Sequence, residues 1–232
     1  MTTPGRQFNA AVTRFWSVSA PLYDLPFLQR WVYRPAQDQV VSELRADGAQ
    51  RIADIACGTG ILAARIQEEL HPEKVCGVDM SDGMLEQARA RSGAVTWLKG
   101  PAERLPFDDD SLDAVVTTSA FHFFDQPAAM REFHRVLAPG GLAAVATISP
   151  PPARLLHRLA PESSGLAHSP SPAEMRRLFT DAGFAITSQR RVDRPLWTRA
   201  VWDLITVGAK AGNRRDGSAD PDGNGVEPVG PI

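Results

Sequence analysis

The segment that most constrains the fold of this chain is Asp54-Ile55-Ala56-Cys57-Gly58-Thr59-Gly60. The run Arg51–Ala56 alternates short apolar residues and predicts a buried strand. Leu62, Ile66 and Leu70 follow at helical spacing, with glutamate and glutamine residues between them. The two glycines therefore sit at a corner between a strand and a helix, which is typical of α/β folds.

Gly58 and Gly60 lack a Cβ atom, so the backbone at this corner can turn tightly and approach a ligand closely. The free amide groups at the start of the following helix point toward the same place. A second apolar run, Lys74–Val78, predicts another strand, and Asp79 closes it 19 residues after Gly60. A carboxylate there can accept hydrogen bonds from both hydroxyls of a ribose. Together these features predict a nucleotide site.

The same segment fits a dinucleotide fingerprint when it is aligned as Gly58-x-Gly60-x-x-Ala63 with Asp79 behind it, so NAD or FAD is one candidate ligand. Asp54 argues against that ligand, because a negative charge four residues before Gly58 is unfavourable for a pyrophosphate. S-adenosylmethionine carries an ammonium group, a sulfonium and a ribose, and it has no phosphate. Charge therefore favours S-adenosylmethionine.

The composition predicts one soluble globular domain, with 43% hydrophobic and 22% charged residues among 232. The formal net charge of −2 gives no electrostatic footprint for nucleic acid. A local basic patch of Arg176, Arg177, Arg190, Arg191 and Arg194 is more often a solvated face. Cys57 and Cys76 lack the number and spacing of a disulfide framework or zinc site, so we expect a cytoplasmic protein without a metal.

Targeting and membrane signals are not apparent in the sequence. No basic region followed by an apolar run opens it, and no apolar stretch approaches the roughly 20 residues that span a bilayer. We therefore expect neither secretion nor a transmembrane segment. The sequence leaves open whether the protein is a monomer or a homodimer.

Strands and helices continue to alternate beyond Asp79. The further predicted strands are 95–98, Leu112–Thr118, Leu142–Ile148, one beginning at Phe184, and Asp203–Ala209. Pro127 is expected to open a helix that includes the core residue Leu137 and stops at Pro139-Gly140-Gly141. Ser171-Pro172-Ala173-Glu174 is a capping box, which predicts a helix ended by Gly183.

Five motifs in this order give the chain a family resemblance. They are Asp54–Gly60, Gly77-Val78-Asp79-Met80-Ser81, Ala102-Glu103-x-Leu105-Pro106-Phe107, Ser111-Leu112-Asp113 and Arg135-Val136-Leu137-x-Pro139-Gly140-Gly141. The chain resembles class I S-adenosylmethionine-dependent methyltransferases of the ubiquinone/menaquinone-methyltransferase-like group (methyltransferase type 11), over roughly Ala49 to Ala209. The resemblance implies an α/β, Rossmann-like, mostly parallel sheet of seven strands in the order 3-2-1-4-5-7-6, with strand 7 antiparallel and helices on both faces.

The resemblance also implies a role for each matching residue. Asp54 would anchor the amino group of the donor, the turn Ala56-Cys57-Gly58-Thr59-Gly60 would face it with backbone, and Asp79 would bind its ribose. The remaining implied contacts are Met80, Ala102 and Glu103 with adenine and Thr118 with the methionine portion. Ala56 stands where many members have glycine, which we expect to be tolerated because the sharper turns fall on Gly58 and Gly60.

We divide the chain into an aromatic-rich helical cap (1–48) within the same domain, the donor-binding methyltransferase domain (49–211) and a disordered tail (212–232). Prolines in the cap, including Pro35, are expected to leave short, broken helices. The segment 150–170 is rich in proline and serine and could be a lid. The cap and the segment 150–170 match the family only loosely, and they are the parts that would contact the substrate.

His122 lies just past the fourth predicted strand and is the candidate base or substrate-positioning residue. Its alternative role is that of a loop histidine bonded to backbone. Tyr23 could close over the donor from the cap, although seven aromatic residues there more often form a packed helix. His134 is predicted to be structural.

The predicted reaction is in-line displacement of the sulfonium methyl group by a substrate nucleophile, which yields S-adenosylhomocysteine. Two rivals remain, an NAD-dependent oxidoreductase and a non-catalytic S-adenosylmethionine-binding regulatory module. Neither Tyr23 nor Tyr33 has a lysine four residues later, as a short-chain dehydrogenase site would. Thr117-Thr118-Ser119-Ala120 lacks the Pro-Pro-aromatic turn of enzymes that methylate DNA bases. Small metabolites, quinone precursors and lipid headgroups therefore remain as acceptors.

Overall fold

The computed structural model describes residues 29–148, 168–195, 198 and 203–212. Tyr23, most of the expected lid and the tail beyond Gly212 lie outside these ranges. The division into cap, domain and tail therefore stays a prediction.

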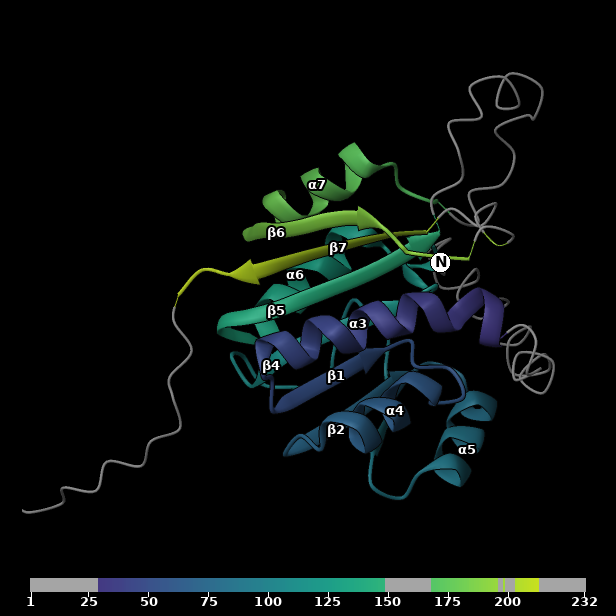
Figure 1. Ribbon diagram of the computed structural model, residues 1–232. Coiled ribbons are helices and arrows are strands. Elements are labelled where there is room, and N and C mark those ends of the chain that lie inside the picture. The colour runs from purple at the N-terminus through teal and green to yellow at the C-terminus, as the bar shows by residue number, and fades with distance from the viewer. Residues whose placement is uncertain (1–28, 149–167, 196–197, 199–202, 213–232) are drawn as a thin grey trace, which may run out of the picture.

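The described residues form one seven-stranded sheet in the order β3-β2-β1-β4-β5-β7-β6 (Figure 1). The strands are β1 (Arg51–Ile55), β2 (Lys74–Asp79), β3 (Thr96–Lys99), β4 (Leu112–Thr118), β5 (Leu137–Ile148), β6 (Phe184–Arg191) and β7 (Asp203–Lys210). Only β7 among them runs antiparallel to its neighbours β5 and β6. The expected strand order and direction are confirmed.

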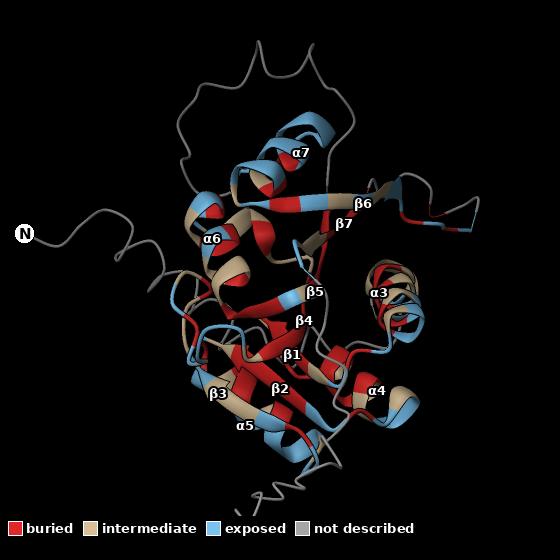
Figure 2. Cartoon of the chain, turned by 90° about the vertical axis from the view of Figure 1, so that its left-hand side faces the viewer, coloured by how far each residue is buried: buried red, intermediate tan, exposed pale blue. Residues whose placement is uncertain are grey.

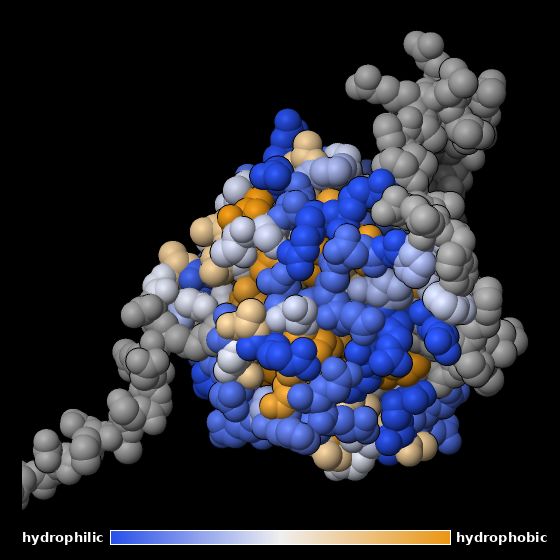
Figure 3. Space-filling view, viewed as in Figure 1, coloured by the Kyte–Doolittle hydropathy of each residue, from blue (hydrophilic) through white to orange (hydrophobic). Residues whose placement is uncertain are grey.

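Helices cover both faces of the sheet. They are a π-helical turn η1 (Gln29–Tyr33), α3 (Arg34–Asp47), α4 (Ile61–Leu70), α5 (Asp82–Arg91), a 3₁₀ turn η2 (Phe121–Phe123), α6 (Gln126–Val136) and α7 (Pro172–Asp181). Figure 2 shows α3 and α4 on one face and α6 and α7 on the other. The described surface on the α3 side is mainly hydrophilic, with small hydrophobic areas between the hydrophilic ones (Figure 3).

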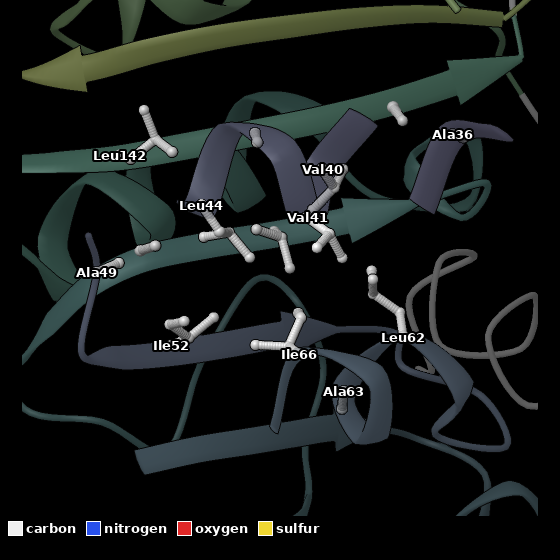
Figure 4. Close-up of a cluster of buried hydrophobic side chains, with 14 of the residues drawn as sticks. Ala36, Val40, Val41, Leu44, Ala49, Ile52, Leu62, Ala63, Ile66 and Leu142 are labelled. Atoms are coloured by element: carbon white, nitrogen blue, oxygen red, sulfur yellow. The ribbon is translucent and has the colours of Figure 1, made fainter. Parts of the chain in front are cut away.

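Each face of the sheet has its own apolar core. On one face, Val41 and Leu44 of α3 pack with Ile52 of β1 and Ile66 of α4 (Figure 4). The core on the other face combines aliphatic residues with four buried phenylalanines, among them Phe133 of α6. Because β1 is buried on both faces, its sequence is apolar at successive positions and shows no inside/outside alternation. A buried charged residue on β1 is therefore exceptional.

Two expected helix boundaries need correction. In the described part of the cap, η1 passes directly into α3 without the expected break. Pro35 lies in the first turn of α3, where a missing backbone N–H is tolerated. α6 ends at Val136, and Leu137 begins β5 by pairing with Leu112. The Pro139-Gly140-Gly141 motif therefore lies inside β5, at a register shift, with Gly140 at φ +78°.

A buried ion pair attaches the start of the helical segment to the sheet. Arg194, which is only 8% exposed, pairs with Asp203 at the start of β7. The same guanidinium donates to the carbonyl oxygens of Trp31 (2.8 Å) and Val32 (2.6 Å). Burial raises the pKa of Asp203, and the hydrogen bond from Arg194 opposes that rise. Arg194 is therefore an internal structural residue and does not belong to a solvated basic patch.

Arg194→Met should lower the free energy of unfolding by about 3–5 kcal/mol, because it leaves the Asp203 carboxylate buried without its partner. Urea denaturation measures the change. Adding Asp203→Asn should recover part of the loss. Arg190→Met is the matched control, since the Arg190–Glu43 pair is partly exposed and should contribute less than about 1 kcal/mol. Equal losses for the two arginine variants would contradict this account.

Candidate functional site

The corner between β1 and α4 contains three residues in the left-handed region, Ala56 (φ +55°), Gly58 (φ +55°) and Gly60 (φ +78°). The backbone N–H of Cys57 donates to the Val78 carbonyl at 3.1 Å and ties the corner to β2. The expectation that the sharp turns fall on the two glycines alone is wrong. Ala56 also turns, in a conformation that costs a residue with a Cβ atom about 1–2 kcal/mol.

The ring of Trp97 in β3 explains why positions 60 and 77 are glycine. Sequence reasoning missed this residue. A Cβ atom built on Gly60 or on Gly77 would lie 2.4 Å from the indole ring. The indole N–H donates to the Ser92 carbonyl at 2.9 Å, which holds the ring in this notch. Gly60 therefore serves packing as well as the turn. The available signal was Gly77, because a glycine inside an apolar strand often marks a close approach.

Asp79 ends β2 beside the corner. Its carboxylate accepts the backbone N–H of Gly58 at 2.9 Å and that of Ser81 at 2.8 Å. Each carboxylate oxygen has a second lone pair, so the group can still accept hydrogen bonds from a ligand. Burial raises the pKa of Asp79, while the backbone N–H groups of Ser81, Gly58 and Met80 act in the opposite direction.

Asp54 is the buried charged residue of β1, and it is 2% exposed. Its Oδ2 atom has no hydrogen-bond partner among the described residues. Burial first, and then the charge of Asp79, raises the pKa of Asp54 to about 8, although the backbone N–H of Ala63 favours the ionised form. A buried carboxylate with a free oxygen is stabilised by a cation. This position therefore fits an ammonium group and disfavours a phosphate.

The expected adenine contacts lie beyond the carboxyl ends of β2 and β3. Met80 is 36% exposed and is the exposed large hydrophobic residue of the described chain. Ala102 is buried, in the loop after β3. Glu103 lies next to it, and its carboxylate accepts the backbone N–H of Asp125 at 2.8 Å. Asp125 is the N-cap residue of α6, so Glu103 has a structural contact that the sequence did not reveal.

The carboxyl end of β4 supplies the remaining residues. Thr118 ends this strand, half-buried, and Ser119 follows at φ +58°. His122 lies in η2, where burial lowers its pKa and thereby favours the neutral imidazole. Its Nδ1 atom is buried and has no partner within the described ranges. Its backbone carbonyl accepts the N–H of His168 at 3.1 Å.

Parallel pairing brings these groups to one edge of the sheet. Asp54 of β1 is in register with Gly77 of β2 and with Val116 of β4. The carboxyl ends of the three strands therefore lie side by side, as Figure 1 shows. In α/β sheets this edge, where the strand order reverses, binds ligands. Within the described chain, no group of three His, Cys, Asp or Glu side chains could hold a metal ion.

Gly60→Ala should lower the free energy of unfolding by about 3 kcal/mol or more, through backbone strain and the clash with Trp97. In a Trp97→Leu background the same substitution should cost only the strain, about 1–2 kcal/mol. Denaturant titration of the two single variants and the double variant gives the coupling between the positions. If the losses in the two single variants simply add up in the double variant, the proposed clash between a Cβ atom at position 60 and the Trp97 ring is wrong.

Comparisons with known proteins agree with this geometry. A family model described as "Methyltransferase domain" matches residues 52–141. The ubiquinone/menaquinone biosynthesis C-methyltransferase UbiE of Geobacter sulfurreducens is 31% identical over 207 residues, which cover 74% of this chain and 79% of that protein. A demethylmenaquinone methyltransferase of Deinococcus radiodurans is 34% identical over 148 residues, or 61% of each chain.

A solved structure from Thermotoga maritima, an S-adenosylmethionine-dependent methyltransferase described as a possible histamine N-methyltransferase, aligns with a TM-score of 0.66 and 26% identity. The alignment covers 85% of this chain and 99% of that one. The chain spans 42–61% of the length of three demethylmenaquinone methyltransferases that it matches over shorter segments. The chain belongs to the class I S-adenosylmethionine-dependent methyltransferases, in the ubiquinone/menaquinone-methyltransferase-like group.

Proposed function

We propose that this chain transfers a methyl group from S-adenosylmethionine to a small-molecule acceptor. The observation that carries the proposal is the Asp54 carboxylate, buried at the end of β1 with one oxygen free among the described residues. Asp79 lies at the neighbouring strand end. Asp79 suits the ribose of either nucleotide, whereas Asp54 suits an ammonium group and opposes the pyrophosphate of NAD.

The other proposed donor contacts follow from their places along the same edge. The corner formed by Ala56, Cys57, Gly58 and Gly60 would face the donor with its backbone. Met80, an exposed apolar side chain, would pack on the adenine ring. The Ala102 backbone and the remaining lone pairs of Glu103 would read the adenine edge, and Thr118 would contact the methionine portion.

When it is bound, the donor supplies an electrophilic methyl group on a cationic sulfur. The chain has to orient the acceptor in line with that group and to exclude water. An amine or thiol acceptor needs little acid–base help. A hydroxyl or carbon acid needs a base, and His122 suits that role because burial favours its neutral form and leaves Nδ1 without a partner in the described chain.

For the acceptor we propose a quinone-like compound, with a lipid headgroup as the second choice. The proposal is supported by the relatives named above, one a demethylmenaquinone methyltransferase and one a ubiquinone/menaquinone C-methyltransferase. None of the described helices is long and apolar enough to cross a membrane. Tyr23 as a substrate contact, a cytoplasmic location and a monomeric or homodimeric state stay predictions.

The test of this function is transfer of label from methyl-labelled S-adenosylmethionine into demethylmenaquinone, followed by chromatography of the quinone fraction. We expect a labelled product with the wild-type chain and a large loss with Asp54→Asn. Binding of S-adenosylhomocysteine without labelling would refute the proposed acceptor. Failure to bind S-adenosylhomocysteine would refute the proposed donor.

Donor binding should depend on pH through Asp54. The carboxyl group, with its pKa near 8, must ionise to pair with an ammonium group, so binding below that pH releases a proton. The Kd for S-adenosylhomocysteine should weaken by up to about tenfold for each pH unit below 8. Calorimetry in two buffers of different ionisation enthalpy measures both quantities. Asp54→Asn should bind weakly without this dependence, and proton uptake by the wild type would contradict the assignment.

The Asp54 carboxyl group should also make the stability of the free protein depend on pH. Stability should fall as pH rises, whereas donor binding should strengthen. Between the ordinary aspartate pKa of 3.8 and the folded value of about 8, the native state holds a proton that the unfolded state has lost. The contribution of Asp54 to the free energy of unfolding should therefore fall as pH rises through this window. Denaturation of wild-type and Asp54→Asn proteins at several pH values isolates this contribution, and a rise with pH would contradict it.

His122→Ala should lower kcat with a hydroxyl or carbon-acid acceptor and leave the Kd for S-adenosylhomocysteine nearly unchanged. The acid limb of the wild-type kcat profile should lie below pH 6.5, because burial lowers the pKa of this imidazole. His134→Ala is the matched control, since that ring packs against Phe184 and lies beside Gly183. Unchanged turnover in the His122 variant would remove the proposed base.

A further inference from the structure

The loop from Gly100 to Ser111 joins β3 to β4 without a helix or a strand. It carries Ala102 and Glu103, which we place at the adenine edge of the donor. Its first amide, that of Gly100, donates to the Asp79 carbonyl at 3.2 Å, so the loop begins beside the proposed ribose contact. An irregular segment of this length needs contacts from outside to hold one conformation.

Arg135, in the last turn of α6, supplies those contacts. A guanidinium has five N–H groups, and Arg135 makes five hydrogen bonds. Two go to the Glu132 carboxylate (2.9 and 2.7 Å) and one goes to Asp109 (2.6 Å). The other two reach the backbone carbonyls of Phe107 (2.9 Å) and Leu105 (3.3 Å). Three of the five bonds therefore end on the loop.

Glu132 completes the attachment. Besides pairing with Arg135, its carboxylate accepts the backbone N–H of Leu105 at 2.6 Å, so both polar backbone groups of Leu105 are held by this pair. The Arg135 carbonyl also accepts the N–H of Asp110 at 3.0 Å. The hydrogen bond from Arg135 lowers the pKa of Glu132, which keeps the carboxylate ionised.

The other end of α6 holds the loop at a second point, because Glu103 accepts the N–H of the N-cap residue Asp125. Leu105 lies two residues after Glu103. Neither Arg135 nor Glu132 lies at the carboxyl edge itself. Their contacts are instead with the backbone that sets the course of the loop from Ala102 onward.

We propose that Arg135, together with Glu132, is a positioning residue for the methyl donor: it holds Leu105–Phe107 so that Ala102 and Glu103 meet the adenine ring. The inference rests on the proposed function and gives a role to the Arg-Val-Leu-x-Pro-Gly-Gly motif, which contacts no proposed ligand position. Arg135 acts on donor affinity and takes no part in the transfer step. Its loss leaves Asp54 and Asp79 in place but lets the backbone that would read the adenine edge move.

Kinetics of Arg135→Ala, Arg135→Lys and Glu132→Gln test this role. We expect KM for S-adenosylmethionine and Kd for S-adenosylhomocysteine to rise by about 10- to 100-fold in Arg135→Ala, with kcat within about threefold of wild type. Arg135→Lys should be intermediate, because an ammonium keeps the charge without the fork of donors. Hydrogen exchange at the amides of 102–105 should accelerate in proportion. If Arg135→Ala does not fold, the same measurements on Arg135→Lys and Glu132→Gln test the proposal.

Lys210→Met is the matched control for general damage to α6. The Lys210 ammonium donates to the carbonyls of His134 and Leu137 and pairs with Asp110, but it touches neither Leu105 nor Phe107. We expect it to lower stability and to leave the donor KM unchanged. A rise in KM equal to that of Arg135→Ala would overturn the proposal.

A ligand with a modified base distinguishes two effects of Arg135→Ala: a displaced adenine contact and general damage to the donor site. S-Inosylhomocysteine has a carbonyl oxygen in place of the adenine amino group, so wild type should bind it more weakly than S-adenosylhomocysteine. Arg135→Ala should weaken binding of the inosine compound several-fold less than that of S-adenosylhomocysteine. Equal weakening of the two ligands would overturn the inference. If the wild type bound neither, the proposed function itself would fail.

Discussion

The free oxygen of the Asp54 carboxylate, buried beside Asp79, is the constraint on which the account of this site depends. β1 is covered on both faces, so the Asp54 side chain lies within a low-dielectric environment that disfavours its ionised form. The neighbouring carboxylate adds to that penalty. A cationic ligand relieves both effects, whereas an anionic one increases them. The fold thus places an ionisable carboxyl group where a cationic ligand favours its charged form.

α6 connects the two halves of the site. Its N-cap residue follows the turn that holds His122, where the acceptor is proposed to bind. Its last turn holds the loop that carries Ala102 and Glu103, where the donor base is proposed to bind. Burial of Phe133 between these ends anchors the helix in the apolar core of that face. One element therefore contacts both the proposed donor side and the proposed acceptor side.

Sequence motifs were sufficient for the strand order, because that order follows from the family resemblance that they carry. The location of the site stays a prediction, and it is supported by the two motifs that end β1 and β2. They were insufficient where a residue's role depends on a distant partner. The notch for Trp97, the buried pairing of Arg194 and the five bonds of Arg135 are made by residues far apart in the chain. Leu137 was placed on a helix because its apolar character suits both a helix and a buried strand.

The most direct test of the central claim is thermal denaturation of the wild-type chain with S-adenosylhomocysteine and, separately, with NADH at the same concentration. A ligand that binds the native state raises Tm. The charge arrangement at Asp54 and Asp79 predicts a clear rise with the phosphate-free nucleoside and none with the pyrophosphate-bearing one. A rise with NADH and none with S-adenosylhomocysteine would contradict the account.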